Sequence, residues 1–282
     1  MNTTSTAQAM LQDVRDRTSW FDLPAAARTA VEAETGPAHK IDMISAGLNS
    51  GIAAILHTRD TSVFVKGLPA RHRRIATQHR EAALASHVTD VAPALRWHIE
   101  AGGWDLLGFE HLVGAPADLS PGSLDLTALA DALTLLGRIP APDIPLARIE
   151  QRWAGHADEQ DLALLTGDRL LHTDLNPHNI LVTPAGARIV DWAWPTLGAA
   201  WIDPACAALW LIAEGHTPTS AEIWAATIPT WQNAPISGID TFTTVNTRLW
   251  EQIAHDDPQP WKQRLHQAAL TWHQHRQDAT GH

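Results

Sequence analysis

The sequence predicts an α+β protein of two lobes, a small antiparallel sheet carrying one main helix and a larger, mostly helical part. Short apolar runs separated by turn residues dominate the chain up to about residue 113. Helix-compatible segments dominate from about residue 115 onward. We therefore expect an N-terminal lobe over residues 1–112, a C-terminal lobe over 113–282, and a cleft between them.

The elements of the first lobe follow one another in a simple order. A helix is predicted over 25–34, because the good helix formers there stop at Gly36-Pro37. A second helix-compatible stretch covers 71–87. Strands are predicted over 41–44, 51–57, 62–67, 94–101 and 104–113.

The second lobe is predicted to be helical with one short β excursion. Leu126, Leu129, Leu133 and Leu136 share a helical face, and another helix is predicted around 146–153. Short strands are expected over 170–171, 180–182 and 188–190, and helices from about 204 to the end.

Composition narrows the classes of partner. A formal net charge of −11 argues against a nucleic-acid surface and against anionic membranes. The first six residues lack the basic start and apolar stretch of a secretion signal, and no apolar run approaches the ~20 residues of a membrane span. We therefore expect a soluble, cytoplasmic protein, and the charge fits a cationic or neutral partner. The oligomeric state is left open.

The sharpest motif has the spacing H-x-D-x-x-x-x-N, formed by His172, Asp174 and Asn179, with Asp191 following a predicted hairpin. Phosphoryl transfer from ATP needs a carboxylate near the attacking hydroxyl and hard oxygen ligands for Mg²⁺. Asp174 suits the first role, and Asn179 and Asp191 suit the second. The competing interpretation is a polar loop whose side chains cap turn amides. The flanking strands and the second aspartate favour the catalytic interpretation.

This segment resembles the catalytic and metal-binding loops of the aminoglycoside phosphotransferase family, relatives of the protein kinases. The resemblance runs from about residue 38 to 218 and includes five elements in the family's order. It implies a protein-kinase-like fold and the cofactors ATP and Mg²⁺. The matching nucleotide-side positions are Gly47, Asn49 and Gly51 in the covering loop, the phosphate-binding Lys66, its partner Glu81, and the adenine-holding hinge at Glu110, His111 and Leu112.

The resemblance also implies roles around the motif. His172 would orient the loop by hydrogen bonds, and Asp203 would brace it, although a helix N-cap is the competing interpretation of Asp203. We expect Asp174, Asn179 and Asp191 to converge on the cleft opposite the ammonium group of Lys66.

Departures from the protein-kinase pattern favour a small-molecule substrate. Thr173 stands where those kinases have an arginine, and Asn176 stands where they have a lysine. Asp191 is followed by Trp-Ala, and no activation segment ending in Ala-Pro-Glu is present. The chain has no G-x-x-x-x-G-K-[S/T] segment, which disfavours a P-loop kinase.

The predicted activity is ATP-dependent phosphorylation of a hydroxyl on a small molecule. An aminoglycoside-type antibiotic or a related aminosugar is the preferred acceptor, and such an acceptor implies a role in antibiotic resistance. Kinases for choline, homoserine or sugars are the alternatives, and a catalytically silent nucleotide-binding module is the alternative of another class. A carboxylate-lined pocket would suit an aminosugar, and a tryptophan cage would suit choline. The acidic candidates are Glu214, Glu222, Asp240, Glu251, Asp256 and Asp257.

Two residue types invite further interpretations. Trp192, Trp194 and Trp201 follow the second aspartate and suit either an acceptor pocket or core packing, with core packing preferred for most of the tryptophans. The histidines at 266, 273 and 275 suggest a metal site, but no carboxylate or cysteine stands at ligand spacing beside them, so a zinc site there is disfavoured.

Overall fold

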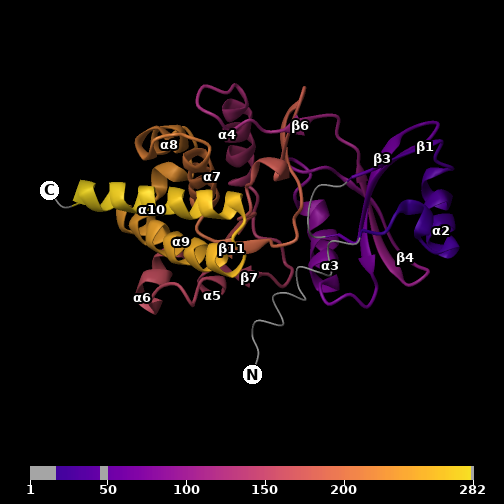
Figure 1. The fold of residues 1–282 in the computed structure, drawn as a ribbon, viewed down its shortest axis with the longest axis horizontal. Coiled ribbons are helices and arrows are strands. Elements are labelled where there is room, and N and C mark those ends of the chain that lie inside the picture. Colours follow the sequence, from indigo (N-terminus) through magenta and orange to yellow (C-terminus); the bar gives the residue numbers. More distant parts are fainter. Residues whose placement is uncertain (1–16, 45–49, 281–282) are drawn as a thin grey trace. The chain divides into compact units, whose positions relative to one another are not determined.

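The protein is described by a computed structural model over residues 17–44 and 50–280 (Figure 1). The chain divides into two compact units. The first contains Met1–Val113 together with Asp191–Ala193, and the second contains Gly114–Val190 and Trp194–His282. Asp191 therefore belongs to the same unit as the five-stranded sheet, although it follows a hairpin of the second unit.

The first unit is built on an antiparallel sheet with the strand order β1-β2-β3-β5-β4. Between β4 and β5, Gly102 and Gly103 have φ values of 58° and 79°, which glycine adopts without a Cβ penalty. The strands are β1 (Lys40–Met43), β2 (Ile52–His57), β3 (Ser62–Pro69), β4 (Leu95–Ala101) and β5 (Trp104–Glu110).

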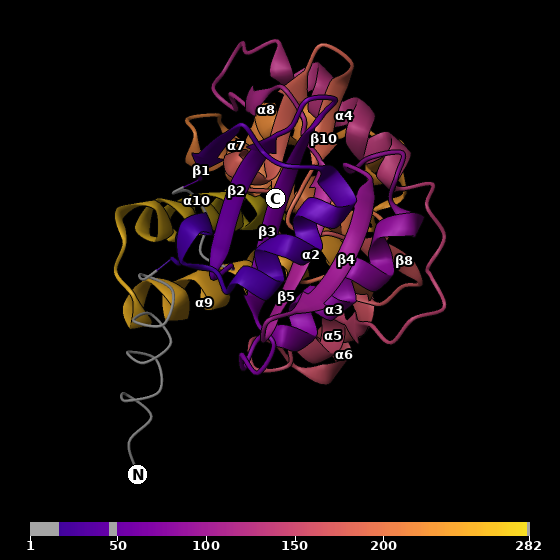
Figure 2. The ribbon, with the colours of Figure 1, turned by 90° about the vertical axis from the view of Figure 1, so that its right-hand side faces the viewer.

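Two helices cover opposite faces of this sheet, α2 (Ala25–Thr35) and α3 (Ile75–Leu84), as Figures 1 and 2 show. Ala27 and Val31 of α2 join an apolar core with the strand residues whose side chains point to the same face. Strand alternation sends the neighbouring residues to the α3 face. That second face carries the polar side chains discussed below.

The second unit contains two small three-stranded sheets. One has the order β10-β9-β6 and the other β7-β11-β8, with β7 and β11 parallel. The strands are β6 (Ala115–Pro116), β7 (Ala147–Arg148), β8 (Arg169–Leu171), β9 (Ile180–Thr183), β10 (Gly186–Ile189) and β11 (Thr196–Gly198). The predicted strands therefore belong to two different sheets, and β8 pairs with β11.

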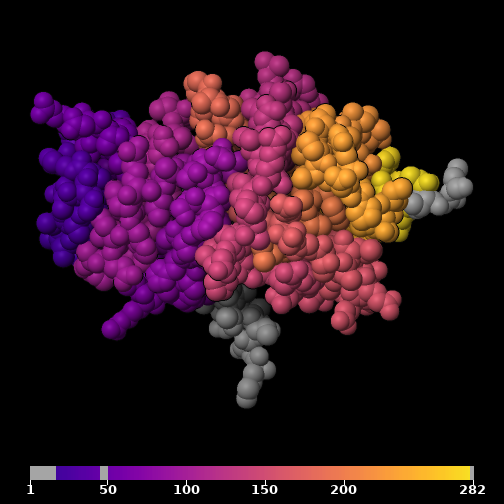
Figure 3. Space-filling model, turned by 180° about the vertical axis from the view of Figure 1, so that it is seen from behind, coloured from indigo at the N-terminus to yellow at the C-terminus, as the bar shows by residue number. Residues whose placement is uncertain are grey.

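Helices form the rest of this unit, and their core is rich in aromatic rings. Phe242 contacts Trp153, Trp201 and Trp272 at centroid distances of 5.7–6.2 Å. Figure 3 shows the orange atoms of α8 at the surface with yellow atoms of α10 beside them. The helices are α4 (Asp125–Leu136), α5 (Ile149–Arg152), α6 (Glu159–Leu162), α7 (Ile202–Ala213), α8 (Pro218–Ala225), α9 (Ile236–Asp256) and α10 (Pro260–Thr280).

Several predicted boundaries differ from the structure, and two of the differences change an element's length markedly. The helix predicted around 146–153 is a single turn, α5, because Ala147 and Arg148 pair instead with β11. The strand predicted to run to Val113 ends at Glu110. Within the described ranges, no helix is both long and apolar enough to cross a membrane.

Candidate functional site

A buried ion-pair cluster on the α3 face of the sheet joins two predicted nucleotide-side residues, Lys66 and Glu81, to a predicted Mg²⁺ ligand, Asp191. Lys66 lies inside β3, three residues before the strand's end, and its Nζ donates to Glu81 Oε1 on α3 at 2.9 Å and lies 2.7 Å from Oε2. The same Nζ donates to Asp191 Oδ1 at 3.0 Å. One ammonium group therefore connects the sheet, the helix and the segment that follows β10.

The cluster keeps Lys66 charged. Burial lowers the pKa of Lys66, but the negative charges of Asp191 and Glu81 outweigh that effect and raise its pKa above the ordinary lysine value. The backbone N–H of Trp192 also donates to Glu81 Oε1 at 3.3 Å. Glu81 thus holds both Lys66 and the residue after Asp191.

Sequence reasoning missed a second cation near this cluster. Arg17 donates from Nη1 to the carbonyl of Ile44, and its charge interacts with that of Asp191. Burial lowers the pKa of Arg17, while Asp191 opposes that shift. Nothing in the local sequence marks Arg17, because its neighbours come from distant segments.

The covering loop is only partly described. Gly47 and Asn49 lie outside the described residues. Gly51 begins the turn into β2, where its N–H donates to Gly67 O at 2.8 Å and its carbonyl accepts from Thr18 N at 2.8 Å. Gly51 is therefore tied to the sheet close to Lys66 in the register, since Gly67 follows Lys66 and Ala53, two residues after Gly51, pairs with Lys66.

The predicted hinge residues follow directly on β5. Glu110 ends the strand, and its N–H donates to Ala94 O at 2.9 Å. His111 and Leu112 are half-buried, and the His111 ring lies 6.0 Å from that of His57 in an edge-on arrangement. Burial lowers the pKa of His111, and the neighbouring His57 adds to the effect. Their role in holding adenine stays a prediction.

In the second unit, two asparagine amides hold the carboxylate of Asp174. Asn176 Nδ2 donates to Asp174 Oδ1 at 3.0 Å, and Asn179 Nδ2 donates to Asp174 Oδ2 at 3.0 Å and to its backbone oxygen at 2.9 Å. Asn176 also accepts from His178 N at 3.0 Å and so caps the short 3-10 turn Pro177–Asn179. Asn176 therefore caps a turn, as the competing interpretation of the loop predicted for it, and it also holds the carboxylate of Asp174.

Asp203 braces the loop that carries Asp174 through hydrogen bonds to its backbone. This buried carboxylate accepts the backbone N–H groups of His172 and Thr173, each at 2.8 Å. Asp203 lies inside the first turn of α7, whose N-cap is Trp201, so the N-cap interpretation is wrong and the bracing interpretation is confirmed. Burial raises the pKa of Asp203, while the bonds from His172 and Thr173 oppose the shift.

His172 and the backbone geometry fix the loop further. His172 Nε2 bonds to Val190 O at 3.0 Å, and its Nδ1 accepts from Asp174 N at 3.3 Å. Within the described part of the chain, Thr173 and Asp191 are the two non-glycine residues with positive φ, 66° and 62°. Such backbone costs on the order of 1–3 kcal/mol per residue and persists where the surroundings enforce it. Thr173 lies between the predicted catalytic-loop residues His172 and Asp174, and Asp191 is itself a predicted Mg²⁺ ligand.

Arg152 is a further residue that sequence reasoning missed. Its Nη1 donates to Thr173 Oγ1 at 2.7 Å and to Trp194 O at 3.3 Å, and it also bonds to Thr196 Oγ1. Arg152 therefore connects the strained residue before Asp174 to β11. The single turn α5 positions this side chain, whereas the sequence predicted a longer helix there.

Replacing Asp203 by asparagine tests the brace. The amide can accept only one of the two N–H groups and would turn a donor toward the other, so we expect a loss of about 1–3 kcal/mol in the free energy of unfolding. Urea denaturation followed by fluorescence measures it. Asp168→Asn is the matched control, because the Asp168 side chain is 92% exposed and should show little change. Equal stability of Asp203→Asn and wild type would contradict the brace.

The donor set suits Mg²⁺. Both Nδ2 bonds of Asn179 lead to Asp174, which leaves its amide Oδ1 as a hard oxygen donor. Asp191 contributes a carboxylate that is partly exposed, with 22% of its side chain accessible. Lys66, Glu81 and Asp191 lie together in the first unit, and Asp174 and Asn179 lie together in the second. That the two groups face each other across a cleft stays a prediction.

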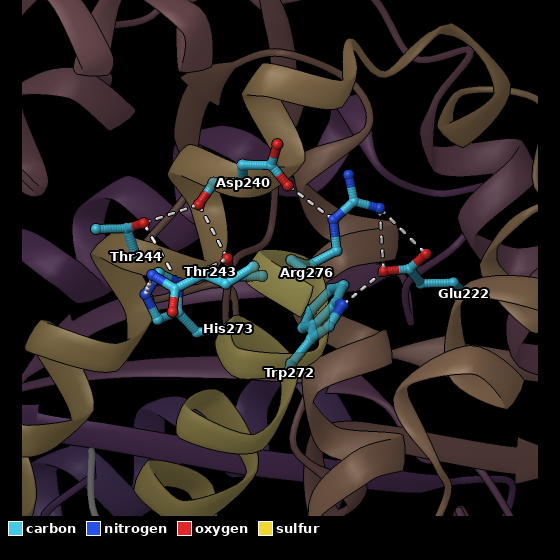
Figure 4. A network of polar contacts seen from close by, with 8 residues as sticks. Glu222, Asp240, Thr243, Thr244, Trp272, His273 and Arg276 are labelled. Atoms are coloured by element: carbon cyan, nitrogen blue, oxygen red, sulfur yellow. Dashed lines mark hydrogen bonds and ion pairs between the residues drawn. The ribbon is translucent and has the colours of Figure 1, made fainter. Parts of the chain in front are cut away.

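Several acidic residues proposed for the acceptor site have other partners. Arg276 of α10 binds Asp240 Oδ1 through Nε at 2.7 Å and Glu222 Oε2 through Nη1 at 3.3 Å (Figure 4). Trp272 Nε1 donates to Glu222 Oε1 at 2.7 Å. These carboxylates therefore hold α8, α9 and α10 together. Asp257 is likewise paired, with Lys262 at 2.6 Å.

The tryptophans divide between core and surface. Trp192 and Trp201 are buried, which confirms the core-packing interpretation for them, whereas Trp194 is 43% exposed. Among the histidines of α10, His273 has its Nδ1 at 3.4 Å from Thr243 Oγ1 of α9 (Figure 4). Its Nε2 lies 2.9 Å from Nε2 of Gln277 in the same helix, so hydrogen bonds engage both ring nitrogens of His273.

Comparison with solved structures identifies the fold. The chain has the protein-kinase-like fold seen in phosphotransferases of small molecules, as solved structures show. This confirms the predicted fold class, and it confirms the family resemblance at the level of the fold. No protein-family model matches the sequence, and no curated protein matches it by sequence.

Three solved structures illustrate the likeness. Choline kinase LicA from Streptococcus pneumoniae superposes with a TM-score of 0.60 at 11% identity, covering 88% of this chain and 99% of LicA. An aminoglycoside phosphotransferase from Alicyclobacillus acidocaldarius gives 0.60 at 14% identity, covering 90% and 94%. The macrolide 2′-phosphotransferase MphH from Brachybacterium faecium gives 0.55 at 18% identity, covering 86% and 97%.

Proposed function

We propose that this protein is an ATP- and Mg²⁺-dependent phosphotransferase that transfers the γ-phosphoryl group to a hydroxyl of a small molecule. The observation that carries the proposal is the buried cluster of Lys66, Glu81 and Asp191, together with the amide-held carboxylate of Asp174. A second structure of LicA, in complex with AMP, resembles this chain with a TM-score of 0.56 at 12% identity, and this supports nucleotide use.

The two parts of the chain would have different functions. Residues 1–112 would form the nucleotide lobe, in which Lys66 contacts phosphate oxygens, Glu81 orients it, and the backbone at Glu110, His111 and Leu112 holds adenine. Residues 113–282 would form the lobe that carries the catalytic loop and the acceptor site. The covering loop at Gly47, Asn49 and Gly51 would bring backbone N–H groups close to the phosphates.

Asn179 and Asp191 would hold Mg²⁺, which when bound neutralises charge on the phosphate oxygens. A short connection supports their joint role. Val190 N donates to Asn179 O at 2.8 Å, and Asp191 is the next residue in the chain. The peptide link limits the separation of Val190 and Asp191 Cα atoms to about 3.8 Å.

In the proposed reaction, Asp174 orients the acceptor hydroxyl and accepts its proton. The acceptor oxygen forms a new bond to the γ-phosphorus, while the bond from that phosphorus to the bridging oxygen breaks and its electron pair leaves with ADP. Asn176 and Asn179 keep both carboxylate oxygens of Asp174 in place. His172 acts on the loop's orientation through its bonds to Val190 O and Asp174 N.

A cationic aminosugar of the aminoglycoside type is the first candidate acceptor, because the formal net charge of −11 suits a cationic partner. Its contacts would have to come from acidic side chains other than Glu222, Asp240 and Asp257, because lysine or arginine already binds those. Glu251 and Asp256 are exposed and Glu214 is half-buried. These three remain candidates.

A quaternary amine such as choline is the second candidate acceptor, and a specific observation favours it. Trp210 and Trp261 stack at 6.2 Å with an interplanar angle of 16°, and Trp250 meets Trp261 edge-on at 6.0 Å. Trp261 is 37% exposed and already lies under the Lys262 ammonium at 5.4 Å from the ring centroid. Its face therefore already accepts a cation, and a quaternary amine would take the place of the Lys262 ammonium there.

A screen of ATP consumption against aminoglycosides, choline-type amines and sugars tests the function and the acceptor together. We expect stoichiometric ADP and one phosphorylated acceptor class. Nucleotide binding without transfer to any acceptor would favour the catalytically silent module instead. Transfer to choline but not to aminosugars would favour the tryptophan cluster as the acceptor site.

Replacing Asp191 by alanine tests the metal-binding role. Because a Mg²⁺ ligand is lost, we expect nucleotide affinity in the presence of Mg²⁺ to fall by at least about 10–100-fold. Affinity without Mg²⁺ should change far less. Calorimetry with and without Mg²⁺ measures both, and Asp168→Ala is the exposed control. An unchanged dependence on Mg²⁺ would remove Asp191 from the metal site.

A further inference from the structure

Four side chains of potential metal ligands meet on the α3 face of the first unit, and they are other residues than Lys66, Glu81 and Asp191. His79 lies on α3, His98 and Glu100 on β4, and Asp105 on β5. Each offers one ligand atom, and these four atoms all lie within 4.8 Å of one another. Two imidazoles with two carboxylates form a donor set typical of Zn²⁺ rather than of Mg²⁺ or Ca²⁺.

The register of the sheet explains why these residues meet. His98 and Glu100 are two apart on β4 and therefore share a face. Glu100 pairs directly with Asp105 across the hairpin, so the two carboxylates are cross-strand neighbours. Helix α3 covers this face and supplies His79. The sequence hides the cluster, because its members span 27 residues and three elements.

The geometry centres on the buried carboxylate of Asp105, whose side chain is 1% exposed. Its Oδ2 lies 3.0 Å from His79 Nε2 and 2.8 Å from His98 Nε2. The two rings are 5.9 Å apart and tilted by 51°, so they converge on the same oxygen from different directions. Without a metal, each Nε2 can donate a proton to Oδ2.

A Zn²⁺ ion fits with small adjustments. Tetrahedral Zn²⁺ with bonds of about 2.0–2.2 Å separates its donor atoms by about 3.3 Å. The two nitrogen–oxygen distances would lengthen by a few tenths of an ångström, and the widest separations would shorten. Gln78 supplies an outer contact, since its Nε2 bonds to Asp105 Oδ1 and to Asp105 O, the latter at 2.7 Å. Such contacts fix the orientation of a ligating carboxylate.

We propose that His79, His98, Glu100 and Asp105 form a Zn²⁺ site that ties α3 to strands β4 and β5. The site is independent of the proposed phosphotransfer, because its ligands include none of the residues assigned to nucleotide, Mg²⁺ or acceptor. It would anchor the helix that also carries Glu81.

Calorimetric titration of the metal-stripped full chain with Zn²⁺ alone tests the proposal. The chain has 16 histidines, so the site is judged from the difference between variants. We expect His79→Ala and His98→Ala each to weaken the tightest Zn²⁺ binding by at least about tenfold. His39→Ala, an exposed histidine of the same unit, should bind like wild type. Circular dichroism checks folding, which both substitutions should preserve because these histidines are 49% and 33% exposed.

Hydrogen exchange gives an independent readout of location. Zn²⁺ should slow amide exchange in α3 and the β4–β5 hairpin of wild type, and should not do so in His98→Ala. The proposal is overturned if wild type binds no Zn²⁺, if both cluster variants bind it as wild type does, or if protection appears only outside these elements.

Discussion

Replacing Asp174 by alanine is expected to lower turnover by about 10²–10⁴-fold while leaving ATP affinity nearly unchanged. The carboxylate is the group we assign to the acceptor hydroxyl, and both of its oxygens are already oriented by the amides of Asn176 and Asn179. Losing it removes the proton acceptor without removing a phosphate or metal contact. Initial rates with saturating Mg·ATP, and calorimetry for ATP binding, measure the two effects.

Asp174→Asn separates chemistry from structure. It keeps the size of the side chain but cannot accept a proton, so its turnover should resemble that of the alanine variant. Asp168→Ala, an exposed aspartate shortly before the loop, should keep wild-type turnover. Near-normal turnover of Asp174→Asn would exclude Asp174 as the base.

Replacing Lys66 by methionine is expected to destabilise the fold by about 3–5 kcal/mol, because the charge of Glu81 would remain buried without its partner. The variant should also lose phosphate-dependent nucleotide binding. Folding raises the pKa of Lys66, so its contribution to stability is complete below the unfolded lysine pKa of about 10.4 and declines as pH rises above it. Neutral-pH denaturation therefore measures the full effect.

The double variant Lys66→Met with Glu81→Leu tests the cause of that loss. Removing both charges should recover much of the stability without recovering nucleotide binding. Lys40→Met is the matched control, because Lys40 pairs with Asp42 at 2.7 Å but both side chains are well exposed. Its effect on stability should be far smaller. If the double variant is no more stable than Lys66→Met, the unpaired buried charge of Glu81 is not the cause of the lost stability.

Local patterns were sufficient to predict most of the elements. Turn residues and alternation located the five strands of the first sheet, and the spacing of His172, Asp174 and Asn179 marked the loop to which we assign catalysis. The pairing of Lys66 with Glu81 followed from the family resemblance, and the structure contains it.

Contacts between distant segments could not be read in the same way. Arg152 reaches Thr173 only because α5 is a single turn that follows a two-residue strand, and such short elements carry no periodic signal. The histidine and carboxylate cluster on α3, β4 and β5 depends on sheet register, which the sequence does not specify by spacing. The pairing of Glu222 and Asp240 with Arg276 is likewise a product of helix packing.

Phosphorus NMR of the purified protein with Mg·ATP and a panel of aminosugars, choline-type amines and sugars is the most direct measurement of the central claim. We predict a new phosphate monoester signal that appears in step with ADP and is lost in Asp174→Asn. ATP that stays intact with every acceptor, or that is only hydrolysed to ADP and inorganic phosphate, would contradict the assignment of this chain as a small-molecule phosphotransferase.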